Sequence, residues 1–283
     1  MVYSHKPNPF FQILVHDLNN SLGLTGAIAG YESTKWRNEA MAEHLMEWLP
    51  EFALKYSDLI DTHSSTWRER MRHAARLVYQ TKNSGQRGEI GEILLHALVR
   101  TVFNSEPAIS KIFFKSSSND TVKGFDAVHV VEINGDLQLW LGEAKFYTNY
   151  NKAATDVISE LSKHVDDQYL RNEFALISGK LDPNWKHYEK VMMLLNKNTS
   201  LDQVFSSMRI PVLLTYKSST IPKYQRATDE FVAEIETEIR NKYKDFSRRN
   251  IPKNIAIHLF LVPLEFKQNL ITEFDKKLRG QQA

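Results

Sequence analysis

A hairpin signal in the middle of the chain constrains the fold more than any other feature of the sequence. Residues 123–147 read KGFDAVHVVEINGDLQLWLGEAKFY, two apolar stretches around Asn134-Gly135. An Asn-Gly pair is favoured in a two-residue type I′ turn, whose twist matches that of the flanking strands. With these two residues at the centre of the turn, Ile133 faces Asp136 and the register of the other opposed pairs follows.

The predicted register brings two carboxylates together at the open end of the hairpin. Asp126 faces Glu143, with Cβ atoms about 4.5 to 5.5 Å apart, and the alternation of side chains places Lys145 on the same face. Like charges that face each other are disfavoured, so we expect a positive charge between them.

A divalent cation is the simplest source of that charge. Two carboxylate oxygens and a backbone carbonyl suit Mg²⁺, with Mn²⁺ as an alternative, and Lys145 could reach a metal-bound or attacking water. The competing interpretation is a solvated strand end at which Lys145 only pairs with an acid. A bulge or a slip of one residue would separate the two acids.

The other face of the hairpin is also largely apolar, which predicts an interior hairpin that is covered on both sides. His129 lies on this second face. We expect it to pack in the core or to form a local hydrogen bond, not to bind metal.

Residues 87–100, RGEIGEILLHALVR, predict an amphipathic helix before the hairpin. Gly88 and Gly91 are costly in a helix, which suggests the close approach of another group. Glu92 could supply a third carboxylate to a metal, with Glu89 as the substitute if the helix is turned differently. The alternative is that the polar stripe is only a solvated face. That stripe consists of Glu89, Glu92, His96 and Arg100.

The remaining pattern predicts a helical N-terminal segment over 1–86 and an α/β domain over 87–283, separated by the turn-forming stretch 81–88. The segment GLTGAIAG, residues 23–30, is interpreted as a loop. Helices are expected near 34–49, 50–60, 65–80, 88–103, 154–165, 184–196, 228–246 and 265–278, and further strands near 111–115, 174–178, 211–216 and 255–262.

Composition excludes several classes of protein. The chain has no cysteine, which excludes disulfides and thiolate chemistry, and it has no apolar run long enough to span a membrane. We expect a cytoplasmic protein without membrane contact. The net charge of +2 is too small for DNA binding by bulk charge, so a nucleic-acid site must be local.

The stretch RNKYKDFSRRNIPK, residues 240–253, is such a local basic region. Lys244, Arg248 and Arg249 are its candidate contacts to a DNA backbone, each replacing a condensed counterion. The stretch could equally be a solvated helix end or the docking face for a partner.

Asp126 in KGFDAVHV, followed by Glu143 and Lys145 in GEAK, resembles the nuclease core called PD-(D/E)XK. Glu92 in RGEIGE is similar to the glutamate of the helix that precedes this core. The proline of the motif is replaced by Phe125. The resemblance implies a restriction-endonuclease-like mixed sheet flanked by helices, with Asp126, Glu143 and Glu92 as metal ligands and Lys145 as a further catalytic residue.

More narrowly, RGEIGEILLHALVR, NDTVKGFDAVHVVE and LWLGEAKFY together resemble the HamA family, the nuclease subunit of the Hachiman antiphage defence system. This resemblance implies a DNA-cleaving effector that forms a complex with a helicase subunit, HamB. The sequence contains no Walker A motif, so we expect any ATP-driven step to come from the partner.

The leading hypothesis is therefore a Mg²⁺-dependent DNA endonuclease. A second hypothesis is a DNA-binding and regulatory subunit of a helicase complex without its own chemistry, and a third keeps the chemistry but takes RNA as substrate.

Overall fold

A seven-stranded mixed sheet forms the centre of the protein, with strand order β1-β2-β9-β8-β7-β6-β5. The computed structural model describes residues 6–18, 21–60, 62–79, 87–110, 124–133 and 135–281. Strands β2, β9, β8 and β7 run parallel to one another, whereas β1 pairs antiparallel with β2 at one end of the sheet and β6 and β5 continue it antiparallel from β7 at the other. The strands are β1 (Gln12–Asp17), β2 (Leu22–Ile28), β5 (Glu106–Ser110), β6 (Ala127–Ile133), β7 (Asp136–Lys145), β8 (Met208–Lys217) and β9 (Ala256–Leu264).

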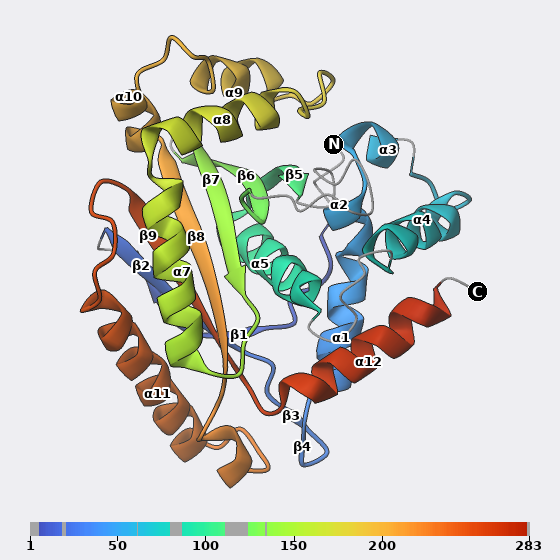
Figure 1. Ribbon diagram of the computed structural model, residues 1–283. Helices are drawn as coiled ribbons and strands as arrows, with labels where there is room; N and C mark the ends of the chain where they lie inside the picture. Colours follow the sequence, from blue (N-terminus) through green and yellow to red (C-terminus); the bar gives the residue numbers. More distant parts are fainter. Residues whose placement is uncertain are drawn as a thin grey trace.

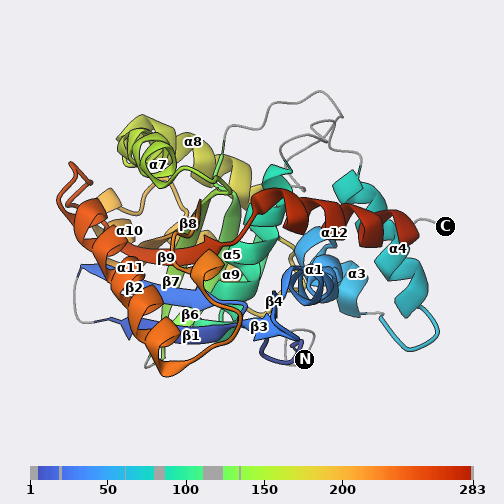
Figure 2. The same cartoon turned by 90° about the horizontal axis from the view of Figure 1, so that it is seen from below.

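Helices cover both faces of this sheet, as the alternation of strands and helices predicted. Figure 1 shows α7 along β7 and β8, while the N-terminal helices and α12 gather at one end of the molecule beside α5 in Figure 2. The helices are α1 (Asn38–Glu47), α2 (Leu49–Ala53), α3 (Tyr56–Ile60), α4 (Trp67–Tyr79), α5 (Gly88–Phe103), α7 (Tyr150–His164), α8 (Asp167–Ser178), α9 (Tyr188–Leu194), α10 (Leu201–Ser206), α11 (Asp229–Ser247) and α12 (Lys267–Gly280). A 3₁₀ turn, η2 (Ile221–Lys223), and a small two-stranded sheet, β3 (Tyr31–Glu32) with β4 (Lys35–Trp36), complete the fold.

Close packing shows that α5 covers the face of β7 opposite to Glu143. A Cβ atom added to Gly142 would lie 2.9 Å from Leu95 of α5, and one added to Gly91 would lie 2.8 Å from Phe146. Glu143 follows Gly142 and its side chain therefore points to the other face, where α7 packs. The close approach expected at Gly91 is thus confirmed, whereas nothing lies within 4 Å of a Cβ at Gly88.

The predicted hairpin and its register are confirmed over most of their length. Strands β6 and β7 pair from Ile133↔Asp136 to Ala127↔Gly142. Gly135 has φ +87°, a conformation that glycine adopts easily, and Asn134 lies outside the described residues. Both faces of the hairpin are buried near its centre, so it is an interior hairpin.

The interpretation of residues 23–30 as a loop is wrong. They overlap β2, whose residues are all buried between β1 and β9. The glycines serve packing and not a turn, because a Cβ at Gly23 would lie 2.3 Å from Nδ1 of His258 and one at Gly26 would lie 2.8 Å from Ile239 of α11. The segment 1–86 is therefore not only helical: it contributes β1 and β2 to the sheet that it shares with 87–283.

The predicted strand at 174–178 is also wrong, because these residues end α8. The side chain of Asp166 accepts a hydrogen bond from the backbone N of Tyr169 and caps the helix. Leu170, Phe174 and Ile177 form its buried stripe at helical spacing. The predicted strand at 111–115 and most of the turn at 81–88 lie outside the described residues.

Helix lengths at the N-terminus also differ from the prediction. The predicted helix 34–49 begins at Asn38, after β4, and the predicted helix 50–60 is divided into α2 and α3. No helix in the described part of the chain is long and apolar enough to cross a membrane.

Buried histidines predict that the protein loses stability in mild acid. Burial lowers the pKa of His44 to about 4 and that of His258 to about 3, whereas an unfolded chain binds these protons near pH 6.5. The unfolded state then binds more protons, so stability is complete above about pH 6.5 and falls as the pH drops toward 4. Each pKa unit is worth about 1.4 kcal/mol. Urea unfolding at pH 7.5 and pH 5 measures the loss.

The variant His258→Gln should reduce the difference in unfolding free energy between these two pH values. The exposed His63 provides the matched control, and His63→Gln should leave the difference unchanged. Equal losses in both variants would contradict the assignment to His258.

Candidate functional site

Asp126 lies just before β6, and its side chain continues the hydrogen bonding to β7 beyond the last backbone pair. Its backbone N donates to the carbonyl of Gly142 at 2.8 Å, and its Oδ2 accepts from the backbone N of Ala144 at 2.7 Å. The regular ladder ends at Ala127↔Gly142, so this carboxylate is bound to β7 directly and cannot swing freely. Only 3% of Asp126 is exposed.

Glu143 and Lys145 come from the neighbouring strand β7 and contact each other. The Nζ atom of Lys145 lies 2.7 Å from Oε1 of Glu143. Oε2 of Glu143 is buried and accepts no hydrogen bond. Asp126 is close enough for its charge to act on both residues. The structure thus brings together the three residues that the sequence singled out.

Two residues of α7 complete this site, and sequence reasoning missed both. Lys145 also forms an ion pair with Oε2 of Glu160, and Nδ1 of His164 lies 3.7 Å from Oε2 of Glu143. Glu160 and His164 are four residues apart, so they share one face of the helix. The sequence contained one sign of this role: both residues lie beside Leu161 on the margin of the apolar stripe of α7, and polar residues at such a margin lie close to the sheet.

Burial and charge shift the pKa values of this cluster in opposite directions. Burial, assisted by the charge of Asp126, raises the pKa of Glu143 well above its usual range, although Lys145 opposes the shift. Burial alone would lower the pKa of Lys145, but the carboxylates of Glu143 and Glu160 raise it. Burial favours a proton on Glu160, yet the neighbouring Glu143 and Lys145 side chains lower its pKa. Lys145 is therefore the charged cation of the cluster.

The positive charge expected beside the two acids is thus present as the ammonium group of Lys145. Within the described residues, no group of three or more His, Asp or Glu side chains is arranged to hold a metal ion. The residues still fit a cation held by two carboxylates, because one oxygen of Glu143 is buried without a donor. Mg²⁺ accepts so few protein ligands when water and phosphate oxygens fill the remaining positions.

The helix acid is carried by α5, whose Gly91 packs closely against Phe146, the residue after β7. Glu92 belongs to α5, which packs on the opposite face of β7, and its role as a third metal ligand stays a prediction. Glu89, the substitute, is buried and its Oε2 accepts no hydrogen bond. The interpretation of their stripe as a solvated face is wrong, since His96 and Arg100 are each 1% exposed.

His96 and Arg100 instead connect the N-terminal helices to the core. Both contact the carboxylate of Glu51 from α2, with His96 Nε2 at 3.2 Å from Oε1. Arg100 also donates to the carbonyl of Ser105, whose hydroxyl is 2.9 Å from Nδ1 of His129. His129 is thus a core histidine with a local hydrogen bond, as predicted.

The basic stretch lies at the C-terminal end of α11. Lys244 and Arg248 are exposed there. Arg249 forms an ion pair with Asp245 and donates to Oγ1 of Thr155 on α7. Arg249 therefore connects α11 to α7, and the other two candidates are more exposed than it is.

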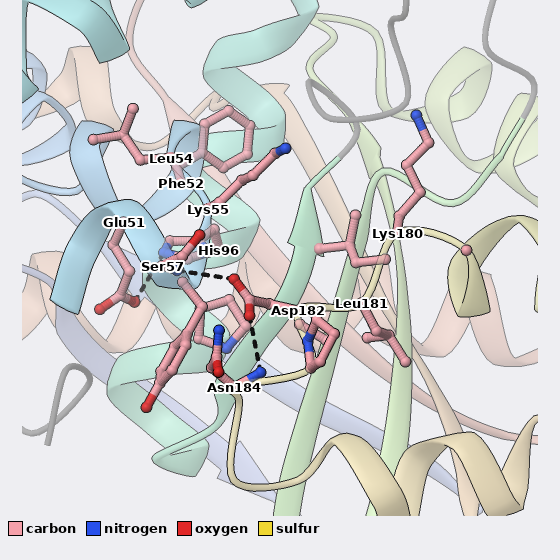
Figure 3. Close-up of a pocket in the computed structure, with 16 residues that line it drawn as sticks. Glu51, Phe52, Leu54, Lys55, Ser57, His96, Lys180, Leu181, Asp182 and Asn184 are labelled. Carbon is pink, nitrogen blue, oxygen red and sulfur yellow. Dashed lines mark hydrogen bonds and ion pairs between the residues drawn. The ribbon is translucent and has the colours of Figure 1, made fainter.

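A cavity of about 580 Å³ lies elsewhere, between α2, α5, β5 and the segment after α8 (Figure 3). Several of its polar groups contact one another: Asp182 accepts from the backbone N atoms of Ser57 and Asn184, and Glu51 contacts His96. The cavity lies where the N-terminal helices meet the edge of the sheet. Asp126 and Glu143 are not among the residues that line it.

Comparison with known proteins shows similarity over most of the chain. A family model described as HamA matches residues 8–278. Anti-bacteriophage protein A of Escherichia coli (strain K12) is 22% identical over 257 residues, which cover 88% of this chain and 46% of that protein. The chain thus spans about half the length of this relative. The matched range includes Asp126, Glu143 and Lys145.

Proposed function

Because the chain belongs to the HamA family, we propose that it is a metal-dependent DNA endonuclease in an antiphage defence system. The observation that carries the proposal is the buried contact of Glu143 with Lys145 at the end of the hairpin, with the charge of Asp126 acting on Glu143 from the start of the neighbouring strand. This is the arrangement that the PD-(D/E)XK resemblance implies. The name of the similar anti-bacteriophage protein supports the defence role.

In this proposal Asp126 and Glu143 hold Mg²⁺, or Mn²⁺ in its place, with Glu92 as a candidate third ligand. The bound ion would polarise the scissile phosphate and lower the pKa of an attacking water. Asp126 is positioned by its hydrogen bond from Ala144, so it offers its carboxylate in a fixed orientation. Lys145 carries a positive charge beside the metal ligands and can stabilise charge at a phosphate.

Burial of the site supports control by a partner. Asp126, Glu143 and Lys145 are 3%, 3% and 8% exposed, and α7 packs against β7, the strand of Glu143 and Lys145. A phosphodiester must therefore gain access before it can be cut. We propose that a helicase subunit of the HamB type provides this control, and that Lys244 and Arg248 contact the DNA backbone.

Incubation of purified protein with supercoiled plasmid tests the function. We expect nicking in Mg²⁺, none in EDTA, and faster nicking when the partner encoded beside the gene is added. Linear, single-stranded and RNA substrates run in parallel decide between DNA and RNA. Absence of cleavage under every condition, with normal binding of DNA, would contradict the nuclease and favour a regulatory subunit.

A further inference from the structure

Lys145 is shared between two elements of the fold. Its ammonium group contacts Glu143 on its own strand, β7, and Glu160 on α7. Glu143 is 4% exposed at its side chain and Glu160 is 37% exposed, so the inner partner is buried and the outer one reaches solvent. No role was predicted for Glu160 from the sequence.

The ammonium of Lys145 and a divalent metal ion would compete for the negative charge of the Glu143 carboxylate. Oε1 of Glu143 lies 2.7 Å from the ammonium of Lys145, and a divalent ion on Glu143 would repel that ammonium at short range. An ammonium in a mostly buried position needs a carboxylate partner, because an unpaired buried charge is strongly unfavourable. Glu160 is the described carboxylate that contacts Nζ of Lys145 besides Glu143.

We propose that Glu160 is a positioning residue that carries the charge of Lys145 when a divalent cation takes the carboxylate of Glu143. This inference rests on the proposed metal-dependent function. It assigns Glu160 an effect on metal affinity that acts through Lys145, without direct contact to the metal. Since Glu160 belongs to α7, the position of this helix also sets how readily Lys145 leaves Glu143.

A double-mutant cycle on the full chain tests this role, with Mg²⁺ affinity measured by titration calorimetry. Glu160→Gln should weaken Mg²⁺ binding about tenfold, because Lys145 then competes for Glu143. In the Lys145→Met background the competing ammonium is absent, and the same Glu160→Gln change should cost less than about twofold. Equal losses in both backgrounds, or no loss in either, would overturn the proposal.

Glu234→Gln is the matched control, because Glu234 also pairs with a lysine, Lys223, but at the surface. It should leave Mg²⁺ affinity unchanged, and thermal melting confirms that each variant is folded. Plasmid nicking separates the two proposals. A wild-type chain that binds Mg²⁺ with the expected coupling but does not cut leaves this inference intact and overturns the nuclease. A wild-type chain that does not bind Mg²⁺ overturns both.

Discussion

Changing Glu143 to Gln and Lys145 to Met in one chain is expected to abolish DNA cleavage while the protein stays folded. The change removes a proposed metal ligand and the adjacent cation, and each kind of group commonly contributes a hundredfold or more, so we expect a loss of at least about a thousandfold. One negative and one positive charge are removed together from a buried contact. The melting temperature should therefore change little.

Nicking rates in Mg²⁺ and thermal melting of the same preparations measure this outcome. The control pair is Lys223→Met with Glu234→Gln, which removes a lysine and a glutamate that contact each other at the surface. The control should cut at the wild-type rate. Cleavage by the Glu143 and Lys145 variant within a few-fold of wild type would exclude the assigned site.

Lys145→Met alone should be less stable than the double variant. Glu143 would then lie buried beside Asp126 without its cation, and burial and that neighbouring charge already raise its pKa. Breaking one side of a buried pair costs more than removing both sides. A melting temperature of the single variant above that of the double variant would contradict this account.

The second large effect is expected at the junction of α2 and α5. Arg100→Met should lower the free energy of unfolding by about 3 to 5 kcal/mol, because it leaves the carboxylate of Glu51 without its main cation. Burial alone would raise the pKa of Glu51, but His96 and Arg100 lower it, so the carboxylate is charged in the folded protein. The carbonyl of Ser105 also loses a donor.

Urea unfolding followed by circular dichroism measures this cost. A further change, Glu51→Gln in the Arg100→Met background, should recover part of the lost stability, because it removes the negative charge of Glu51 that Arg100 no longer neutralises. Arg240→Met is the matched control, because Arg240 pairs with Glu236 on the exposed side of α11 and should cost no more than about 1 kcal/mol. Equal costs for Arg100→Met and Arg240→Met would contradict the role of burial.

The hairpin shows how much of the site local sequence can determine. The Asn134-Gly135 pair and period-two alternation predicted the pairing of Ile133 with Asp136, and the structure confirms it as far as Ala127↔Gly142. The same alternation predicted that Glu143 and Lys145 share one face of the hairpin, where the structure shows them in contact. These relations depend on residues that are near neighbours in the chain or joined by one turn, so sequence alone could determine them.

The tertiary structure decided the features that depend on distant segments. The sequence pattern predicted that Gly23 and Gly26 are loop residues. In the fold they lie in β2, and His258 and Ile239 pack against them. His96 and Arg100 formed a polar stripe whose burial follows only from the position of α2.

Glu160 is a further residue whose role depends on the tertiary structure. Its spacing from His164 is visible in the sequence, but its contact with Lys145 depends on how α7 packs on β7 and β8. Local sequence determines periodicity and turns, whereas the partner of a buried polar group is set by long-range packing. The sequence therefore determined the hairpin that carries Asp126, Glu143 and Lys145, and only the fold determined which residues surround them.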